Sequence, residues 1–263
     1  MRTISLILLL LFLLVGSMVP PYDPNAIDFT AINSGPTALH WFGTDGLGRD
    51  LLSRLMVAAP ISLAAPIVVA IVGISLGTTV ALLTMWSKGG ILDRATSRVS
   101  DIFIAFPAIL IAILVVAMFG KGLVPVIASL AVAYAPYAYR LVRTEVMVIR
   151  NSGYIRSLEI QGMSKAILTK KHVLPNISGL LWAQTTIFIG YALVDVAALS
   201  FLGLGTQPPS ADWGSMVASG LSSAVSGDPW ESLTASLAIF VVIICAVLTG
   251  DRVEAQANRR RMS

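Results

Sequence analysis

Long apolar runs recur along almost the whole chain, and they limit its possible folds more than any other feature of the sequence. A helix that crosses a bilayer needs about 20 mostly apolar residues, and runs near that length occur at six places. Charged residues make up 12% of the chain, whereas a soluble domain carries about 25%. The sequence therefore predicts an all-α membrane protein that crosses the bilayer several times.

We predict six transmembrane helices from these runs, of which the first, third and fourth are close to the lower limit of length. The first run follows Arg2 directly and would also suit a signal peptide, but the residues after it lack the small-x-small pattern of a cleavage site. In chain order, the predicted spans are Ile4–Val19, Val57–Met85, Ile102–Phe119, Leu123–Tyr139, Ile177–Leu202 and Leu233–Gly250.

The positive charges predict the orientation of these helices. If the N-terminus is cytoplasmic, fifteen of the 18 Lys and Arg residues fall on the cytoplasmic side, where such residues concentrate. We therefore predict that both termini are cytoplasmic, and that the net charge of +4 reflects contact with anionic lipid rather than with nucleic acid. The fifteen are Arg2, Lys88, Arg94, Arg98, Arg140, Arg143, Arg150, Arg156, Lys165, Lys170, Lys171, Arg252, Arg259, Arg260 and Arg261, and the other three are Arg49, Arg54 and Lys121.

A polar and basic stretch, Tyr154–Asn176, separates the fourth and fifth predicted spans. It predicts a short helix–turn–helix, in which Gly162 permits the turn and Ser164 caps the second helix. Pro175 is expected to break that second helix before the fifth span. Such a hairpin suits the groove of a soluble partner, and the alternative is an amphipathic hairpin that lies on the lipid surface.

The loop between the first two spans, Pro20–Met56, is too long for a tight turn, and its second half carries the stretch GTDGLGRDLLSRL. Its glycines allow tight turns. Asp50 is placed either to cap the following helix or to pair with Arg54 at i,i+4 spacing. On residue chemistry alone, the stretch also fits a helix start at the outer membrane interface, with Trp41 as an aromatic anchor.

Two features inside the spans bear on function. The small-xxx-small motif Gly73–Gly77 allows close contact between helices, either within this chain or with another subunit. Asp195 is the one acidic residue in the apolar part of a span, where a charge is costly unless it faces a cavity or a partner. It is therefore either a polar contact in a translocation route or a neutral, hydrogen-bonded Asp between helices.

Three stretches resemble the second membrane subunit of the peptide and nickel importers that ATP-binding cassettes (ABC) power. GTDGLGRDLLSRL resembles the GTDxLGRDxxSRL signature of that family, and Ser200–Gly214 resembles its SFLGLGxxPPxxxWG stretch. The region from Tyr154 to Asn176 resembles its cytoplasmic coupling loop, whose pattern is Y-V-E-A-A-R-x-x-G-x-S followed by H-x-L-P-N. The signature loop residues are Gly43, Thr44, Asp45, Gly48, Arg49 and Asp50.

The sequence departs from the family pattern at two places. The Glu-Ala-Ala core of the coupling loop reads Arg156-Ser157-Leu158 here, and Glu159 replaces the usual Arg, so the charges at these two positions are reversed. Peptide-type members of the family often carry Glu directly after the residue that matches Asp195, and this chain has Val196 there. This departure favours a nickel or metal-chelate substrate. The resemblance assigns ATPase coupling to Tyr154, Arg156, Leu158, Glu159, Gly162, Ser164 and Pro175. Asp195 is the candidate residue of the translocation pathway, because of its place in an apolar span.

The resemblance implies a type I ABC importer permease fold in a bacterial inner membrane. Its expected partners are a second homologous permease, two cytoplasmic ATPase subunits and an extracytoplasmic binding protein that delivers peptides or nickel and metal-chelate complexes. The expected layout is a first helix at 1–19, an extracytoplasmic loop at 20–56, a core at 57–251 with a coupling loop at about 144–176, and a basic cytoplasmic tail at 252–263.

The chain has no G-x-x-x-x-G-K-[ST] phosphate loop. We therefore expect no cofactor and no enzymatic activity in this chain, with ATP and Mg bound by the partner ATPase subunits. Intramembrane proteolysis is disfavoured, because Asp195 has no second carboxylate in a span and both histidines lie in polar loops. The remaining alternative is an ATP-independent channel or a structural membrane subunit.

Overall fold

The computed structural model describes residues 15–87 and 90–262, with side chains described up to residue 250. Most of the first predicted span, Ile4–Val19, lies outside these residues, as do Lys88 and the side chains of the basic tail. The described residues form helices joined by loops, with an isolated antiparallel bridge between Thr44 and Asp50.

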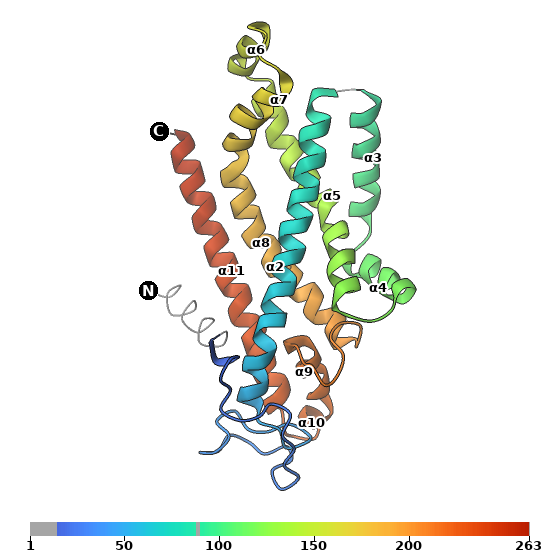
Figure 1. Cartoon of the computed structure of the whole chain (residues 1–263), viewed down its shortest axis with the longest axis vertical. Coiled ribbons are helices and arrows are strands. Elements are labelled where there is room, and N and C mark those ends of the chain that lie inside the picture. The colour runs from blue at the N-terminus through green and yellow to red at the C-terminus, as the bar shows by residue number, and fades with distance from the viewer. Residues whose placement is uncertain (1–14, 88–89, 263) are drawn as a thin grey trace.

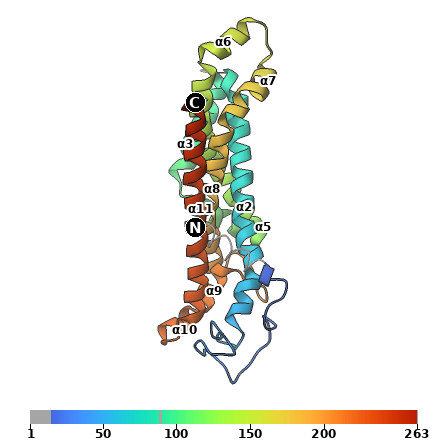
Figure 2. The same ribbon diagram turned by 90° about the vertical axis from the view of Figure 1, so that its left-hand side faces the viewer.

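The longest helices run along the long axis of the molecule, and both views show the same elongated bundle (Figures 1 and 2). A hairpin of α6 and α7 forms one end, and the loop before α2 forms the opposite end together with α9 and α10. The helices are α2 (Leu51–Thr84), η1 (Met85–Ser87), α3 (Ile91–Ala105), α4 (Ala108–Phe119), α5 (Leu123–Arg150), α6 (Gly153–Ile160), α7 (Lys165–Leu168), η2 (Thr169–Val173), α8 (Leu174–Phe201), α9 (Trp213–Ser219), α10 (Leu221–Val225) and α11 (Trp230–Met262).

Three described helical segments are long and apolar enough to cross a membrane: Leu51–Ser87, Lys165–Phe201 and Trp230–Gly250. A fourth crossing is added if the bent pair of α3 and α4 counts as one span. The protein is thus an all-helical membrane protein over its described residues, and the number of six spans stays a prediction.

The predicted third span, Ile102–Phe119, is wrong as a single helix. The first four residues of this predicted span are the last residues of α3, and the part from Ala108 onwards forms α4. The two helices meet at 89°. Pro107 accounts for the break, because a proline disfavours the helical conformation at the residue before it, and Phe106 is extended with φ −102° and ψ 134°. With 12 residues, α4 is about 18 Å long, too short to cross a bilayer alone.

The predicted small-residue motif packs α2 against α5 within the chain. A Cβ atom added to Gly73 would lie 2.9 Å from Cβ of Tyr134, and one added to Gly77 would lie 2.4 Å from the carbonyl oxygen of Ala135. Since Cβ atoms do not approach backbone oxygens this closely, only glycine permits the observed separation. Of the two alternatives for this motif, the contact within the chain is therefore the one observed.

The loop after α8 is fixed to the first half of α2 through Trp213, which is buried. Its backbone N–H donates to Oγ of Ser62, and its indole Nε1–H donates to the carbonyl oxygen of Leu55 over 3.0 Å. Gly214 lies directly against the backbone of Ala197 on α8. The stretch Ser200–Gly214 thus joins α2 and α8 at the end of the bundle opposite the α6–α7 hairpin (Figure 1).

Candidate functional site

The hairpin at one end of the bundle has its predicted turn and the predicted cap of its second helix. Ser152 caps α6, and Gly162 turns the chain with φ +87°, a conformation that favours glycine. Oγ of Ser164 then accepts a hydrogen bond from the backbone N–H of Ile167 and caps α7. No heavy atom lies within 4 Å of a Cβ added to Gly162, so the requirement for glycine at this turn is conformational.

The predicted break at Pro175 is wrong, because the helical path continues from Lys165 to Phe201. A five-residue π-helical turn, Thr169–Val173, precedes the proline. In this wider turn the N–H of Leu174 bonds to the carbonyl oxygen of Thr169. Pro175 lies in the first turn of α8, where its missing N–H costs little. The second helix of the hairpin is therefore continuous with α8.

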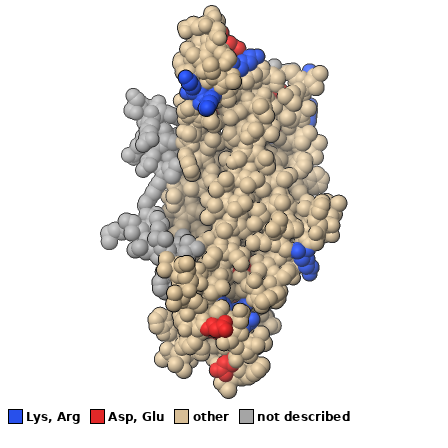
Figure 3. All heavy atoms as spheres, in the orientation of Figure 1, with Lys and Arg blue, Asp and Glu red and all other residues tan. Residues whose placement is uncertain are grey.

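The hairpin presents apolar and charged side chains outwards. Ile160 is 87% exposed and Tyr154 51% exposed, whereas Ile155 and Leu168 are buried. Arg156 and Glu159, which carry the reversed charges, are both exposed, and Leu158 is half-buried. Figure 3 shows Lys and Arg side chains around this end of the molecule. Exposed apolar residues on a short projecting helix suit the groove of another protein.

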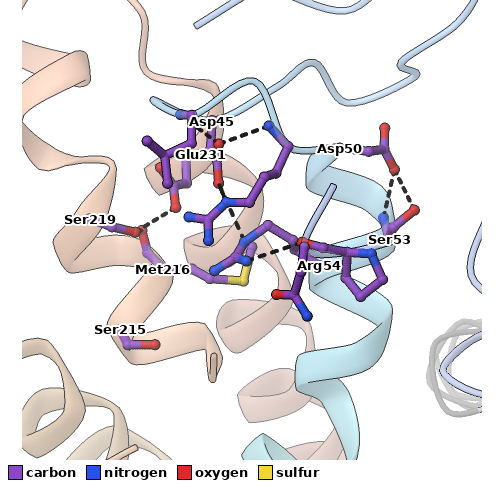
Figure 4. Close-up of polar contacts among 12 residues, drawn as sticks. Asp45, Asp50, Ser53, Arg54, Ser215, Met216, Ser219 and Glu231 are labelled. Atoms are coloured by element: carbon purple, nitrogen blue, oxygen red, sulfur yellow. Dashed lines mark hydrogen bonds and ion pairs between the residues drawn. The ribbon is translucent and has the colours of Figure 1, made fainter. Parts of the chain in front are cut away.

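Asp45 is the centre of a polar network at the opposite end of the bundle (Figure 4). Its buried carboxylate accepts hydrogen bonds from the backbone N–H groups of Leu47 and Arg49 and from Nε of Arg49 over 2.7 Å. Nε of Arg54, also buried, lies 3.5 Å from Oδ2 of Asp45. One carboxylate thus holds the signature loop in its turn and pairs it with the first turns of α2.

The glycines of the signature loop allow it to pack directly on the preceding chain. Gly48 has φ +75°, and a Cβ atom there would fall 1.8 Å from the carbonyl oxygen of Asp28. Gly43 has φ +86° and lies similarly tightly against Ser34. The side chain of Thr44 bonds to the carbonyl oxygen of Ala31. The spacing of the glycines is therefore set by close backbone contact within the loop.

Asp50 caps α2, the first of its two predicted roles. Its Oδ2 accepts from the backbone N–H of Ser53 over 2.8 Å and from the Ser53 hydroxyl, while Oδ1 lies 2.9 Å from Nδ1 of His40. Arg54 is paired with Asp45 and not with Asp50 among the described residues. Trp41 is exposed next to this network, and its role as an interfacial anchor stays a prediction.

Glu231, at the start of α11, belongs to the same network and is absent from the residues predicted from the sequence. Its buried side chain accepts a hydrogen bond from Oγ of Ser219 on α9 and lies beside Asp45 and Arg54 in Figure 4. Asp45 and Glu231 come from opposite ends of the chain, so no local spacing could reveal the contact. The network therefore ties the signature loop, α2, α9 and α11 into one cap at the end of the bundle opposite the hairpin, called the outer cap because the predicted orientation places it outside the cytoplasm.

Asp195 lies between the two ends, on α8. Its Oδ2 accepts a hydrogen bond from the hydroxyl of Tyr134 on α5 over 2.8 Å, and the carboxylate is half-buried. Val196 is buried in the core formed by α2, α4, α5 and α8. The structure thus places the predicted residues in three separate regions, namely the hairpin, the middle of the bundle and the outer cap. Within the described parts of the chain, no three His, Cys, Asp or Glu residues gather to hold a metal ion.

Known proteins resemble this chain over most of its length. A family model described as "Binding-protein-dependent transport system inner membrane component" matches residues 73–261. The glutathione transport system permease protein GsiD of Pectobacterium atrosepticum is 39% identical over 232 residues, which cover 88% of this chain and 76% of that protein. The proteins of the same name from Escherichia coli O1:K1 and Shigella boydii serotype 4 are each 38% identical over 246 residues, 93% of this chain and 80% of theirs.

Proposed function

The chain belongs to the family of binding-protein-dependent transport system inner membrane components, the permease subunits of ABC importers in the bacterial inner membrane, and from this we propose how its two ends work. The α6–α7 hairpin docks on cytoplasmic ATPase subunits. A second, homologous permease completes the pathway, and an extracytoplasmic binding protein delivers the cargo to the outer cap.

The main support for this proposal is the projecting hairpin with its exposed apolar residues. It projects from the bundle as two short capped helices with exposed Tyr154 and Ile160 at its surface and buried Ile155 and Leu168 at its base. A groove that accepts it would bury its apolar residues and leave its charges at the rim. Because Arg156 and Glu159 are both exposed, the ATPase groove should carry charges complementary to this reversed order.

Transport follows as alternating access. ATP binding closes the ATPase pair, the hairpin transmits the movement to the bundle, and the pathway opens outwards for the cargo. Hydrolysis and product release return it to the inward-open state. Coupling requires that the chain contact its partners differently in the two states, and the continuous helical path from α7 into α8 joins the hairpin to the span that carries Asp195. We propose that Asp195, half-buried within an apolar span, lines the pathway.

We propose a small peptide of the glutathione kind as the cargo. The relatives named above, which are permease proteins of glutathione transport systems and are 38% to 39% identical to this chain over most of their length, support this class. Val196 is the residue that favoured a metal chelate in the sequence. Its side chain is buried in the core, so it does not support a metal chelate as the cargo. Nickel and metal-chelate complexes are therefore the second choice.

The test is to purify the tagged chain from its host in mild detergent and to identify the proteins that accompany it by mass spectrometry. We expect a second permease and ATPase subunits. Recovery of the chain alone, together with flux through vesicles in the absence of ATP, would instead establish a channel. The binding protein encoded with this system is then titrated with glutathione, other short peptides and nickel chelates, and binding of the chelates alone would overturn the peptide assignment.

A further inference from the structure

Trp86 lies at the cytoplasmic end of α2, in the short helix Met85–Ser87, and touches both sides of the coupling hairpin. Its indole Nε1–H donates to Oγ1 of Thr169 over 2.9 Å, far along the chain from it. The guanidinium carbon of Arg150 lies 5.5 Å from the centre of the ring, and Nζ of Lys165 lies 5.9 Å from it. Both distances are within the range of cation–π attraction.

The three partners lie at the points where the hairpin leaves and rejoins the bundle. Arg150 is the last residue of α5, Lys165 is the first of α7, and Thr169 opens the π-helical turn that leads into α8. Nη1 of Arg150 is buried and has no hydrogen-bond partner among the described residues. The face of the Trp86 ring is therefore an important favourable contact for this guanidinium group.

The helix behind Trp86 reaches the other end of the molecule. Helix α2 begins at Leu51, directly after the signature loop, and runs to Thr84, and Figure 1 shows it along almost the whole bundle. The close backbone contacts at Gly73 and Gly77 leave α2 no room to slide on α5. A displacement of the hairpin that reaches Trp86 is consequently shared between α5 and the half of α2 that follows Pro66.

We propose that Trp86 is the positioning residue through which the hairpin moves α2. On the proposed function, on which this inference rests, the movement that ATP binding imposes on the α6–α7 hairpin enters the bundle along two routes. One is the continuous helix α7–α8. The other is the contact of Trp86 with Thr169, Arg150 and Lys165, which carries it into α2 and so towards the Asp45–Arg54 pair of the outer cap.

Four variants separate the parts of this contact. Trp86→Phe keeps an aromatic face and removes the N–H donor, and Thr169→Val removes the acceptor while leaving the indole intact, so both should have the same effect. Trp86→Ala removes the donor and the ring. Trp182→Phe is the matched control, because Trp182 on α8 is 69% exposed.

The complex is reconstituted in vesicles with its binding protein, and cargo uptake is measured against ATP hydrolysed. Since contacts along a coupling route change coupling by about 2- to 30-fold, we expect uptake per ATP to fall about threefold in Trp86→Phe and Thr169→Val and about tenfold in Trp86→Ala. ATP hydrolysis, subunit composition and the Trp182→Phe control should stay unchanged. An unaltered ratio in Trp86→Ala would refute the inference, as would loss of the ATPase subunits, which would make Trp86 part of the docking site.

Hydrogen exchange of the purified chain tests the contact without any partner. In Trp86→Ala, the amides of the hairpin, from Asn151 to Val173, should exchange about tenfold faster, because the hairpin loses its attachment to α2. Unchanged exchange would overturn the inference even if transport proves to be ATP-driven. Failure of the wild-type complex to couple ATP to uptake would instead overturn the proposed function, so the two failures are distinguishable.

Discussion

The hydroxyl of Tyr134 on α5 donates a hydrogen bond to Oδ2 of Asp195 on α8 over 2.8 Å, and it thereby gives the carboxylate of an apolar span a partner on a different helix. The ring of Tyr134 is itself held by Phe188 on α8, in an edge-to-face contact with centroids 5.3 Å apart. Two contacts between the same pair of helices therefore fix the position of the acidic side chain.

Replacing Tyr134 with Phe should destabilise the protein by about 1–3 kcal/mol, because the half-buried Asp195 loses a hydrogen-bond donor while the packing of the ring is retained. The measurement is chemical or thermal unfolding of the purified protein in detergent. Tyr137→Phe is the control, since the hydroxyl of Tyr137 is exposed and makes a long 3.4 Å contact. Equal effects of the two variants would contradict the importance of the Tyr134–Asp195 bond.

Gly77→Ala should cost about 1–3 kcal/mol, because the new methyl group would overlap backbone atoms of Ala135 and Tyr139 that cannot move without separating α2 from α5. Gly190→Ala in α8 provides a matched control. Its added Cβ would meet Cβ of Ala246 at an ordinary 3.6 Å, so its helix should be unchanged or slightly more stable. A Gly77→Ala protein that unfolds at the wild-type temperature would show that α2 and α5 can separate freely.

Asp45→Ala should cost about 3–5 kcal/mol, because it leaves the buried side chain of Arg54 without its counter-charge and releases two backbone N–H groups of the signature loop. Limited proteolysis should then cut the loop from Pro20 to Asp50 faster than in the wild type. Asp23→Ala, at an exposed carboxylate of the same loop, should change stability by less than about 1 kcal/mol. Similar cleavage rates for both variants would argue against the network as the element that orders this cap.

Gly162→Val should abolish cargo uptake while the chain still inserts in the membrane. Valine cannot adopt the φ of +87° found here without strain of about 1–2 kcal/mol, so the turn between α6 and α7 would reshape. Gly162→Asn is the informative partner, since asparagine tolerates this conformation better than other residues. It should retain a substantial part of the uptake. Normal uptake by Gly162→Val would contradict the assigned role of the hairpin.

Local chemistry was enough to predict several parts of this molecule. The caps at Asp50 and Ser164, the turn at Gly162 and the close approach at Gly73–Gly77 each depend on a few neighbouring residues whose conformational preferences are strong. These caps, this turn and this helix contact can therefore be predicted from the local sequence, and the structure has them at the predicted residues.

Other parts depend on competition between local preferences or on distant contacts. Hydropathy alone made Ile102–Phe119 a single span, but the conformational limit that Pro107 places on Phe106 outweighs it. At Pro175 the reverse holds, because a π-helical turn accommodates the proline and the helix continues. The contacts of Glu231 with the outer cap and of Trp86 with Thr169 join segments that are far apart in the chain. Such contacts cannot be predicted from local patterns in a single sequence.

The two prolines of α2, Pro60 and Pro66, both lie in its outer half, and the rest of the helix towards Thr84 contains none. Each proline removes a backbone hydrogen bond and lowers the resistance of the helix to bending. Helix α2 is consequently stiffer against bending in the half near Trp86 than in the half near the outer cap. When the cytoplasmic end of α2 is displaced, the part of the helix between Trp86 and Pro66 would move as a rigid body. The helix would then bend at Pro66 and Pro60, so that its outer end changes direction.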